Sequence, residues 1–175
     1  MRSLPLLYAA ALAVLMGGCT ITDRSPNTTP LDTQAKWALL PIANHTDTPQ
    51  AGLRAEAIVD GVLRARGVKS LARYPATLNP EALFEASERR VQEDARKWAR
   101  EQGARYGVYG AVDEWRYKVG VDGEPAVGLA LHIVDLQSDE VVFSAVGAKS
   151  GWSRDALSGV AQGLVRDLLG PVRLK

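Results

Sequence analysis

The chain has 175 residues, with 21 lysines and arginines against 20 aspartates and glutamates, so its formal net charge at pH 7 is +1. A balance so close to zero argues against a general nucleic-acid binder, and any charged working surface must come from segregation of charges on the folded domain. Cys19 is the only cysteine, which excludes an internal disulfide.

The N-terminus, residues 1–18, predicts an export signal. Arg2 gives a basic start, residues 4–16 are almost wholly apolar, and two glycines precede Cys19. The apolar stretch covers roughly 20 Å of a hydrocarbon layer about 30 Å thick, too little for a good membrane span. Its end resembles the lipobox of bacterial lipoproteins, whose cysteine thiol receives a diacylglycerol before the chain is cut in front of it. We therefore expect a lipidated Cys19; an ordinary secreted protein with a chance cysteine is the alternative.

A change of composition at Lys36 separates two regions of the exported chain. Residues 20–35 are rich in threonine, proline, asparagine and aspartate, which predicts a disordered tether after the lipidated Cys19. Residues 36–175 are long enough for a single periplasmic domain with a core of its own.

Hydrophobic periodicity predicts the order βαβαβββα for this domain. The first half alternates strands with helices, and the second half is an antiparallel meander followed by a helix. We therefore expect a mixed α/β (α+β) fold with a single mixed β-sheet and helices packed on it. The expected strands are 37–42, 68–74, 106–119, 127–136 and 141–148; the expected helices are 51–66, 79–103 capped by Asn79, and 153–171 capped by Ser153.

Little in the sequence points to catalysis or to a bound metal or cofactor. No nucleophile elbow, zinc-protease motif or P-loop is present. His45 and His132 cannot form a metal site with Cys19 if that thiol carries lipid, and His132 is interpreted as a structural or surface histidine. The loop 44–47 either binds a ligand at the end of the first strand or simply caps the following helix. We expect no enzymatic activity.

Trp152 is a candidate for membrane contact. It lies in a small polar loop, residues 150–153, just before the last helix. Tryptophan prefers the membrane–water interface, where its ring is buried and its N–H stays hydrated. The alternative is that the ring folds back onto the domain.

Four acids near the first meander turn are candidates for a binding surface. Asp113 and Glu114 are neighbours on one strand and point to opposite faces, so they are not a paired catalytic dyad. Asp122 and Glu124 lie at the adjoining hairpin tip. Together the acids form one negative surface or are merely solvated.

Several stretches together resemble the PelC family, the outer-membrane lipoproteins of the Pel exopolysaccharide export system. The first strand with its continuation into the helix, the last hairpin and the tryptophan loop carry the likeness, and chain length and lipobox agree. Parts of the pattern also look like the wider group that includes the TolB amino-terminal domain, LpoB and CsgG. The stretches concerned are residues 36–44, 48–56, 132–143 and 151–152.

The resemblance implies a non-enzymatic ring of identical subunits on the periplasmic face of the outer membrane, below a porin of the PelB type. It implies that Trp152 contacts membrane lipid and that a negative funnel receives a cationic polysaccharide; Asp122 is the preferred funnel acid, followed by Glu124 and Asp113. Thr20, where aspartate would favour the inner membrane, points to outer-membrane sorting.

Three other functions remain as alternatives. The first is an LpoB-like lipoprotein that regulates a cell-wall synthase through protein contacts, although the expected tether is short for that reach. A CsgG-like channel is less favoured because no long alternating hairpins appear. A lipid-anchored enzyme is less favoured because no catalytic constellation appears.

Overall fold

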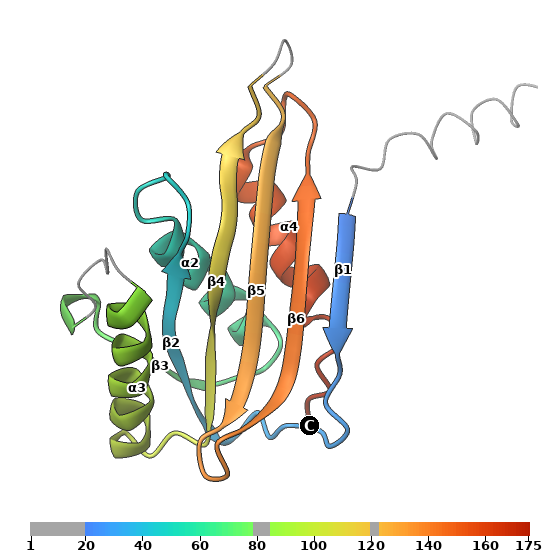
Figure 1. Ribbon diagram of the computed structural model, residues 1–175. Helices are drawn as coiled ribbons and strands as arrows, with labels where there is room; N and C mark the ends of the chain where they lie inside the picture. The colour runs from blue at the N-terminus through green and yellow to red at the C-terminus, as the bar shows by residue number, and fades with distance from the viewer. Residues whose placement is uncertain (1–19, 79–84, 120–122) are drawn as a thin grey trace, which may run out of the picture.

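The computed structural model describes residues 20–78, 85–119 and 123–175. Cys19, Asn79 and Asp122, of which lipidation, helix capping and polysaccharide binding are expected, lie outside the described residues. The described part is one mixed sheet with helices packed against it, as predicted (Figure 1). Its elements are β1 Thr20–Ser25, β2 Lys36–Asn44, α2 Ala51–Ala65, β3 Ser70–Arg73, the short 3₁₀ helix Ala76–Leu78, α3 Glu85–Glu101, β4 Tyr106–Tyr117, β5 Pro125–Asp135, β6 Glu140–Ser150 and α4 Leu157–Leu169.

The six strands lie in the order β1-β6-β5-β4-β2-β3. β2 runs parallel to both β3 and β4, and the remaining neighbours are antiparallel. The chain therefore crosses from β2 through α2 to β3, on one side of β2 in the sheet. It then crosses back from β3 through α3 to β4, on the other side of β2. Because such crossovers are right-handed, α2 and α3 lie on opposite faces of the sheet. α4 joins α2 behind the sheet in the view of Figure 1.

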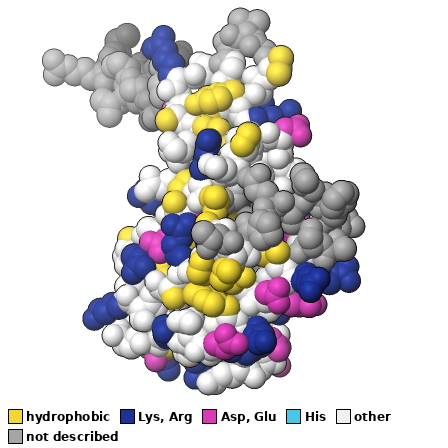
Figure 2. Space-filling view, turned by 90° about the vertical axis from the view of Figure 1, so that its left-hand side faces the viewer, with side chains coloured by type: hydrophobic (Ala, Val, Ile, Leu, Met, Phe, Trp, Pro, Cys, Tyr) yellow, Lys and Arg dark blue, Asp and Glu magenta, His cyan; other side chains and the backbone are white. Residues whose placement is uncertain are grey.

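Both faces of β2 are buried, which explains its nearly continuous apolar sequence. Leu39 belongs to the larger core, between the sheet and helices α2 and α4. Leu40 belongs to the smaller core, between the sheet and α3. The larger core also contains one face of the middle meander strand, β5, whose side chains Val127, Leu129, Leu131 and Ile133 are fully buried. Seen from the side of β3, hydrophobic side chains form a narrow vertical column with charged side chains on both sides (Figure 2).

Pro41 interrupts β2 where the pairing with β3 has ended. The register between β2 and β4 shifts between Leu39 and Ile42, and two side chains bond the backbone there. The Ile42 N–H donates to Glu56 Oε1 at 3.2 Å, and Gln92 Nε2 donates to the Pro41 carbonyl at 2.7 Å. Helices α2 and α3 thus supply hydrogen bonds that a longer β3 would otherwise make.

The prediction that residues 20–35 form a disordered tether is wrong. β1 pairs antiparallel with β6, from Thr20 opposite Lys149 to Ser25 opposite Ser144. Farther along, Leu31 is buried and exchanges backbone hydrogen bonds of 2.9 and 3.0 Å with the C-terminal segment 173–175. A polar sequence suits an edge strand because backbone groups make the pairing, so composition alone misses it. The sheet therefore already includes Thr20.

The prediction that Ser153 caps the last helix is also wrong. α4 begins at Leu157, and its N-cap residue Ala156 makes no side-chain capping bond. Asp155 instead accepts the Trp152 N–H, and the Leu157 N–H donates to the Tyr117 hydroxyl at 3.2 Å. A tertiary contact from β4 therefore takes the place of a local cap. Within α4, Val160, Leu164 and Leu168 form a buried stripe at helical spacing, whereas Ala156 precedes the helix and is exposed.

Candidate functional site

Several exposed large apolar side chains lie near one end of the sheet, where β1 begins and β4 and β6 end (Figure 1). We call this the Trp152 end. Other exposed apolar side chains, Leu78, Val141 and Val146, lie elsewhere. The exposed fractions are 73% for Ile21, 102% for Val119 and 53% for Trp152. Val119 and Trp152 lie just beyond the ends of β4 and β6, whereas Ile21 pairs with Ala148, which is level with Gly128 and Glu114, and so lies lower along the strands. Isolated apolar residues on a surface are ordinary, but a group at one end suggests a partner.

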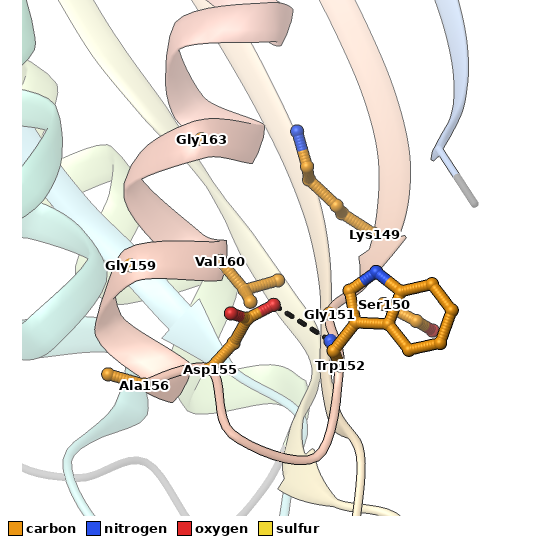
Figure 3. Close-up of a pocket in the computed structure, with 9 residues that line it drawn as sticks. All are labelled: Lys149, Ser150, Gly151, Trp152, Asp155, Ala156, Gly159, Val160 and Gly163. Carbon is orange, nitrogen blue, oxygen red and sulfur yellow. Dashed lines mark hydrogen bonds between the residues drawn. The ribbon is translucent and has the colours of Figure 1, made fainter. Parts of the chain in front are cut away.

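Trp152 projects from a tight connection between β6 and α4. Its backbone N–H donates to Asp155 Oδ2 at 2.7 Å, and Figure 3 shows the indole turned away from the helix. A Cβ at Gly151 would lie only 2.5 Å from Val160 Cγ2, so the backbone can approach α4 this closely only with glycine there. The Trp152 side chain is about half exposed, and its membrane contact stays a prediction.

A pocket of about 330 Å³ lies between the Trp152 loop and α4 (Figure 3). Its helical wall is formed in part by Gly159 and Gly163, which leave room because they carry no side chain. Lys149 lines the pocket, and its ammonium pairs with Asp167 at 2.8 Å. The pocket's lysine is therefore already neutralised by α4.

Two further cations near the Trp152 end also have partners. Lys118 Nζ donates to Ser150 Oγ at 2.7 Å and lies 4.0 Å from Glu124 Oε2. Arg116 Nε pairs with Glu114 Oε1 at 3.0 Å. Three cations near this end are therefore paired within the subunit, while Arg154, two residues after Trp152, is exposed.

The candidate funnel acids have different partners. Glu124 Oε2 lies 4.0 Å from Lys118 Nζ, a long contact, and its carboxylate is exposed. Asp113 lies at a register shift in β4 and bonds His45 Nδ1 at 3.0 Å, while His45 Nε2 lies 3.2 Å from Glu88. The bond to Asp113, and then Glu88, raise the pKa of His45 above its usual 6.5 against the opposing effect of burial.

His132 and the loop after β2 have structural roles. His132 Nδ1 lies 2.9 Å from Ser144 Oγ, and burial lowers the pKa of the ring. Asn44 holds its own loop, since Nδ2 donates to the Thr48 carbonyl at 2.9 Å and Oδ1 accepts from the Thr46 hydroxyl at 2.8 Å. The loop is thus bonded to itself, and its Thr48 carbonyl accepts the N–H of Ala51, the first residue of α2, at 3.3 Å, although the N-cap residue Gln50 makes no side-chain capping bond.

Two classes of feature are missing from the described part of the chain, residues 20–78, 85–119 and 123–175. No cluster of three or more histidine, cysteine or acidic side chains there is arranged to hold a metal ion. No helix in those ranges is both long and apolar enough to cross a membrane.

Solved structures match almost the whole chain. The PelC dodecamer from Paraburkholderia phytofirmans is 39% identical with a TM-score of 0.76, and the match covers 90% of this chain and 99% of that one. The chain belongs to the PelC family. A single-residue variant of the same PelC, also a dodecamer, matches with the same identity, TM-score and share of this chain, and over 100% of its own length.

A more distant structure shares the fold alone. Lipoprotein GNA1162 from Neisseria meningitidis is 17% identical with a TM-score of 0.53, covering 76% of this PelC-family chain and 94% of its own. Neither a protein-family model nor a curated protein matches the sequence.

Sequence reasoning missed two residues of the Trp152 end. Ile21 was assigned to the tether and Val119 to the end of a strand. One available signal was the isolated isoleucine in a segment that is otherwise polar, TITDRS. Val119 carries no such signal, because a valine that ends a strand looks the same whether it is buried or exposed.

Proposed function

We propose that this chain is a non-enzymatic, lipid-anchored component of a Pel-type exopolysaccharide exporter. It forms a ring on the periplasmic face of the outer membrane and guides a cationic polysaccharide to a porin of the PelB type. The supporting observation is the 39% identity, over 90% of the chain, to a PelC that is a dodecamer. A head-to-tail contact repeated around an axis closes such a ring.

The membrane side of the ring is the Trp152 end. Lipid on Cys19 would be attached next to Thr20, which is paired with Lys149 and lies close to Trp152. Two acyl chains make attachment practically permanent, since each buried CH₂ contributes about 0.8 kcal/mol. An exposed indole at the same end suits the membrane–water interface.

We assign the polysaccharide contact to acids of the hairpin between β4 and β5, which belongs to the same Trp152 end and would line the inner rim of the ring there. Glu124 supports this assignment because its carboxylate is exposed and only loosely paired. Asp122 follows β4 in the same connection. Asp113 is a weaker candidate because its carboxylate is already bonded to His45. Attraction between exposed charges is screened by salt, so many weak contacts let a polymer slide rather than bind tightly.

The side facing α3 and β3 offers a surface for repeated contact between subunits. Its column of hydrophobic side chains runs along the length of the molecule (Figure 2). The edge strand β3 lies at this border of the sheet and β1 at the other. A contact between these unlike borders would be head-to-tail, as ring closure requires.

Particle mass and export test the proposal together. The detergent-solubilised lipoprotein should have the mass of a closed ring of subunits, and a monomer would contradict the ring. Asp122→Asn combined with Glu124→Gln should keep that mass but lower the secreted polysaccharide, because the funnel loses charge. Glu140→Gln, an exposed acid at the far end of the sheet, is the control. Normal export by the double variant would exclude the acids.

Lipid attachment has a separate test. Cys19→Ser should abolish incorporation of labelled fatty acid and leave an unprocessed or soluble form. Equal labelling of the variant and the wild type would show that Cys19 is not the lipidated residue.

A further inference from the structure

We propose that β1 is a releasable strap. Docked on β6, it holds lipid on Cys19 next to the sheet; released, it becomes a linker between that lipid and the domain. The released state serves the enzymes that modify and cut the chain at Cys19, and the docked state serves the assembled ring. This proposal rests on the lipid anchor at Cys19, which belongs to the proposed function.

β1 is attached to the domain mainly by its backbone. It pairs with β6 from Thr20 opposite Lys149 to Ser25 opposite Ser144. Five of its six side chains are exposed, and only Thr22 is half-buried. An edge strand that buries so little apolar area opens at a lower free energy than the core does. β1 should therefore leave the sheet without unfolding the rest of the domain.

Gly147 of β6 makes room for β1. A Cβ at Gly147 would lie 2.6 Å from the Ile21 carbonyl oxygen and 2.8 Å from Thr22 Cγ2. The Leu168 side chain would lie 3.1 Å away, and its end can move. Glycine weakens the interior of a strand, and it often marks a site where another backbone comes close. Here that backbone is β1, so a methyl group at position 147 should displace the strap and leave β6 in place.

The strap ends at Asn27. This side chain is buried and bonds both the carbonyl and the N–H of Arg173, at 3.0 and 2.9 Å. Leu31, farther along, is buried as well. Release therefore frees residues 20–26. At about 3.4 Å per extended residue these residues reach roughly 24 Å, whereas with β1 docked the lipid is held beside Thr20.

Processing at Cys19 requires the released state. An enzyme that binds an extended chain bonds its backbone along an edge, so that edge must be accessible. With β1 docked, β6 occupies one backbone edge of residues 20–25, and the folded domain stands directly beside Cys19. Docking after the cut removes the linker, so the subunits meet with their orientation already fixed.

Hydrogen exchange of the complete, detergent-solubilised lipoprotein tests the two states. The slowest amides of residues 20–25 should exchange about tenfold faster than those of Leu31 and Thr33, which bond the C-terminal segment. Gly147→Ala should speed exchange in residues 20–25 further and leave Leu31 unchanged. Gly61→Ala is the matched control, because a Cβ there meets nothing within 4 Å. Equal rates for the two segments in the wild type, or no effect of Gly147→Ala, would overturn the strap.

A cross-link tests the order of events in cells. Asp23 lies opposite Val146, and both are exposed, so cysteines at these positions are close enough for a disulfide while β1 is docked. In Asp23→Cys combined with Val146→Cys, a thiol oxidant added during synthesis should accumulate precursor. The same oxidant added after lipidation should give the cross-linked mature lipoprotein. Val146→Cys alone is the control.

The other outcomes of the cross-link are equally decisive. Normal lipidation of chains that are already cross-linked would overturn the need for release, and a cross-link that never forms would overturn docking. A wild type that takes up no labelled fatty acid would instead remove the proposed anchor. The exchange contrast between residues 20–25 and Leu31 does not depend on that anchor.

Discussion

The two ends of the sheet are built in opposite ways. At the closed end, where residues 27–33 meet 173–175, Asn27 Nδ2 donates to the Arg173 carbonyl at 3.0 Å and Asn27 Oδ1 accepts the Arg173 N–H at 2.9 Å. The Thr33 N–H adds a bond of 3.1 Å to the Lys175 carbonyl. At the Trp152 end, β4 and β6 are instead followed by large apolar side chains in water, Val119 and Trp152.

This contrast shows which end is complete within the subunit. The closed end buries Leu31 and bonds its backbone internally. The Trp152 end leaves apolar area uncovered, which costs free energy unless a partner covers it. Stability should therefore depend on the closed end, and attachment and transport on the other.

Leu31→Ala is expected to have the largest effect on stability. Leu31 is 4% exposed, and truncation of a buried leucine costs about 2–5 kcal/mol of unfolding free energy. Ile21→Ala, in the same N-terminal segment but at the Trp152 end, should change that free energy by less than about 0.5 kcal/mol. Denaturant titration of both variants measures the difference. Equal effects would mean that the two ends are not distinct.

Arg66→Lys should have the next largest effect. At the closed end, the Arg66 guanidinium donates to the carbonyls of Leu169, Gly170 and Val172 just after α4, and burial lowers its pKa. Lysine cannot reproduce this forked geometry, so the loss should be about 1–2 kcal/mol. Arg154→Lys, an exposed change near Trp152, is the control for thermal unfolding. An unchanged melting temperature for Arg66→Lys would contradict the capping role.

His45 should give a smaller, pH-dependent effect. Its pKa is raised on folding by Asp113 and Glu88, so its stabilisation is complete below the unfolded pKa and is lost as pH rises through the folded one. The deficit of His45→Gln should therefore be larger at about pH 5.5 than at about pH 8. Because the ring is half exposed, the deficit should stay below about 1 kcal/mol. A deficit that grows with pH would refute the assignment.

Trp152→Ala should have the smallest effect on stability and a clear effect on export. Removing an exposed side chain should shift the unfolding free energy by no more than about 0.5 kcal/mol. Trp115→Ala, 3% exposed in β4, should cost about 3–5 kcal/mol. Melting of the detergent-solubilised lipoprotein and secreted polysaccharide are the two readouts. A large drop in melting temperature with normal export would make Trp152 an ordinary packing residue.

Sequence patterns predicted the elements whose side chains are buried. The alternation in β5 and the helical stripe of α2 are visible in the residues themselves, because one face of each enters the core. β1 was missed because backbone pairing with β6, not side-chain burial, holds it. The cap of α4 was misplaced because Tyr117, far along the chain, bonds Leu157.

The candidate site was only partly predictable for the same reason. Exposure of Trp152 followed from its small polar loop. The partners of Asp113 and Glu124 did not, since a register shift in β4 and a cation at the hairpin determine them. The placement of Ile21 near the Trp152 loop also depends on the pairing of β1 with β6, which no pattern in the sequence indicates.

The pairing of β1 with β6 also limits the orientations that a lipid-anchored subunit can adopt relative to the membrane. Because Thr20 already belongs to the sheet, lipid on Cys19 would be joined to the domain through a single residue, about 3.8 Å of backbone. A lipoprotein on a long flexible linker rotates freely, and it loses that rotational entropy when it assembles. Subunits attached so closely would stand with the same end toward the bilayer before they meet. Their search for one another becomes two-dimensional, with rotation mainly about the membrane normal, so a weak lateral contact suffices to assemble the ring.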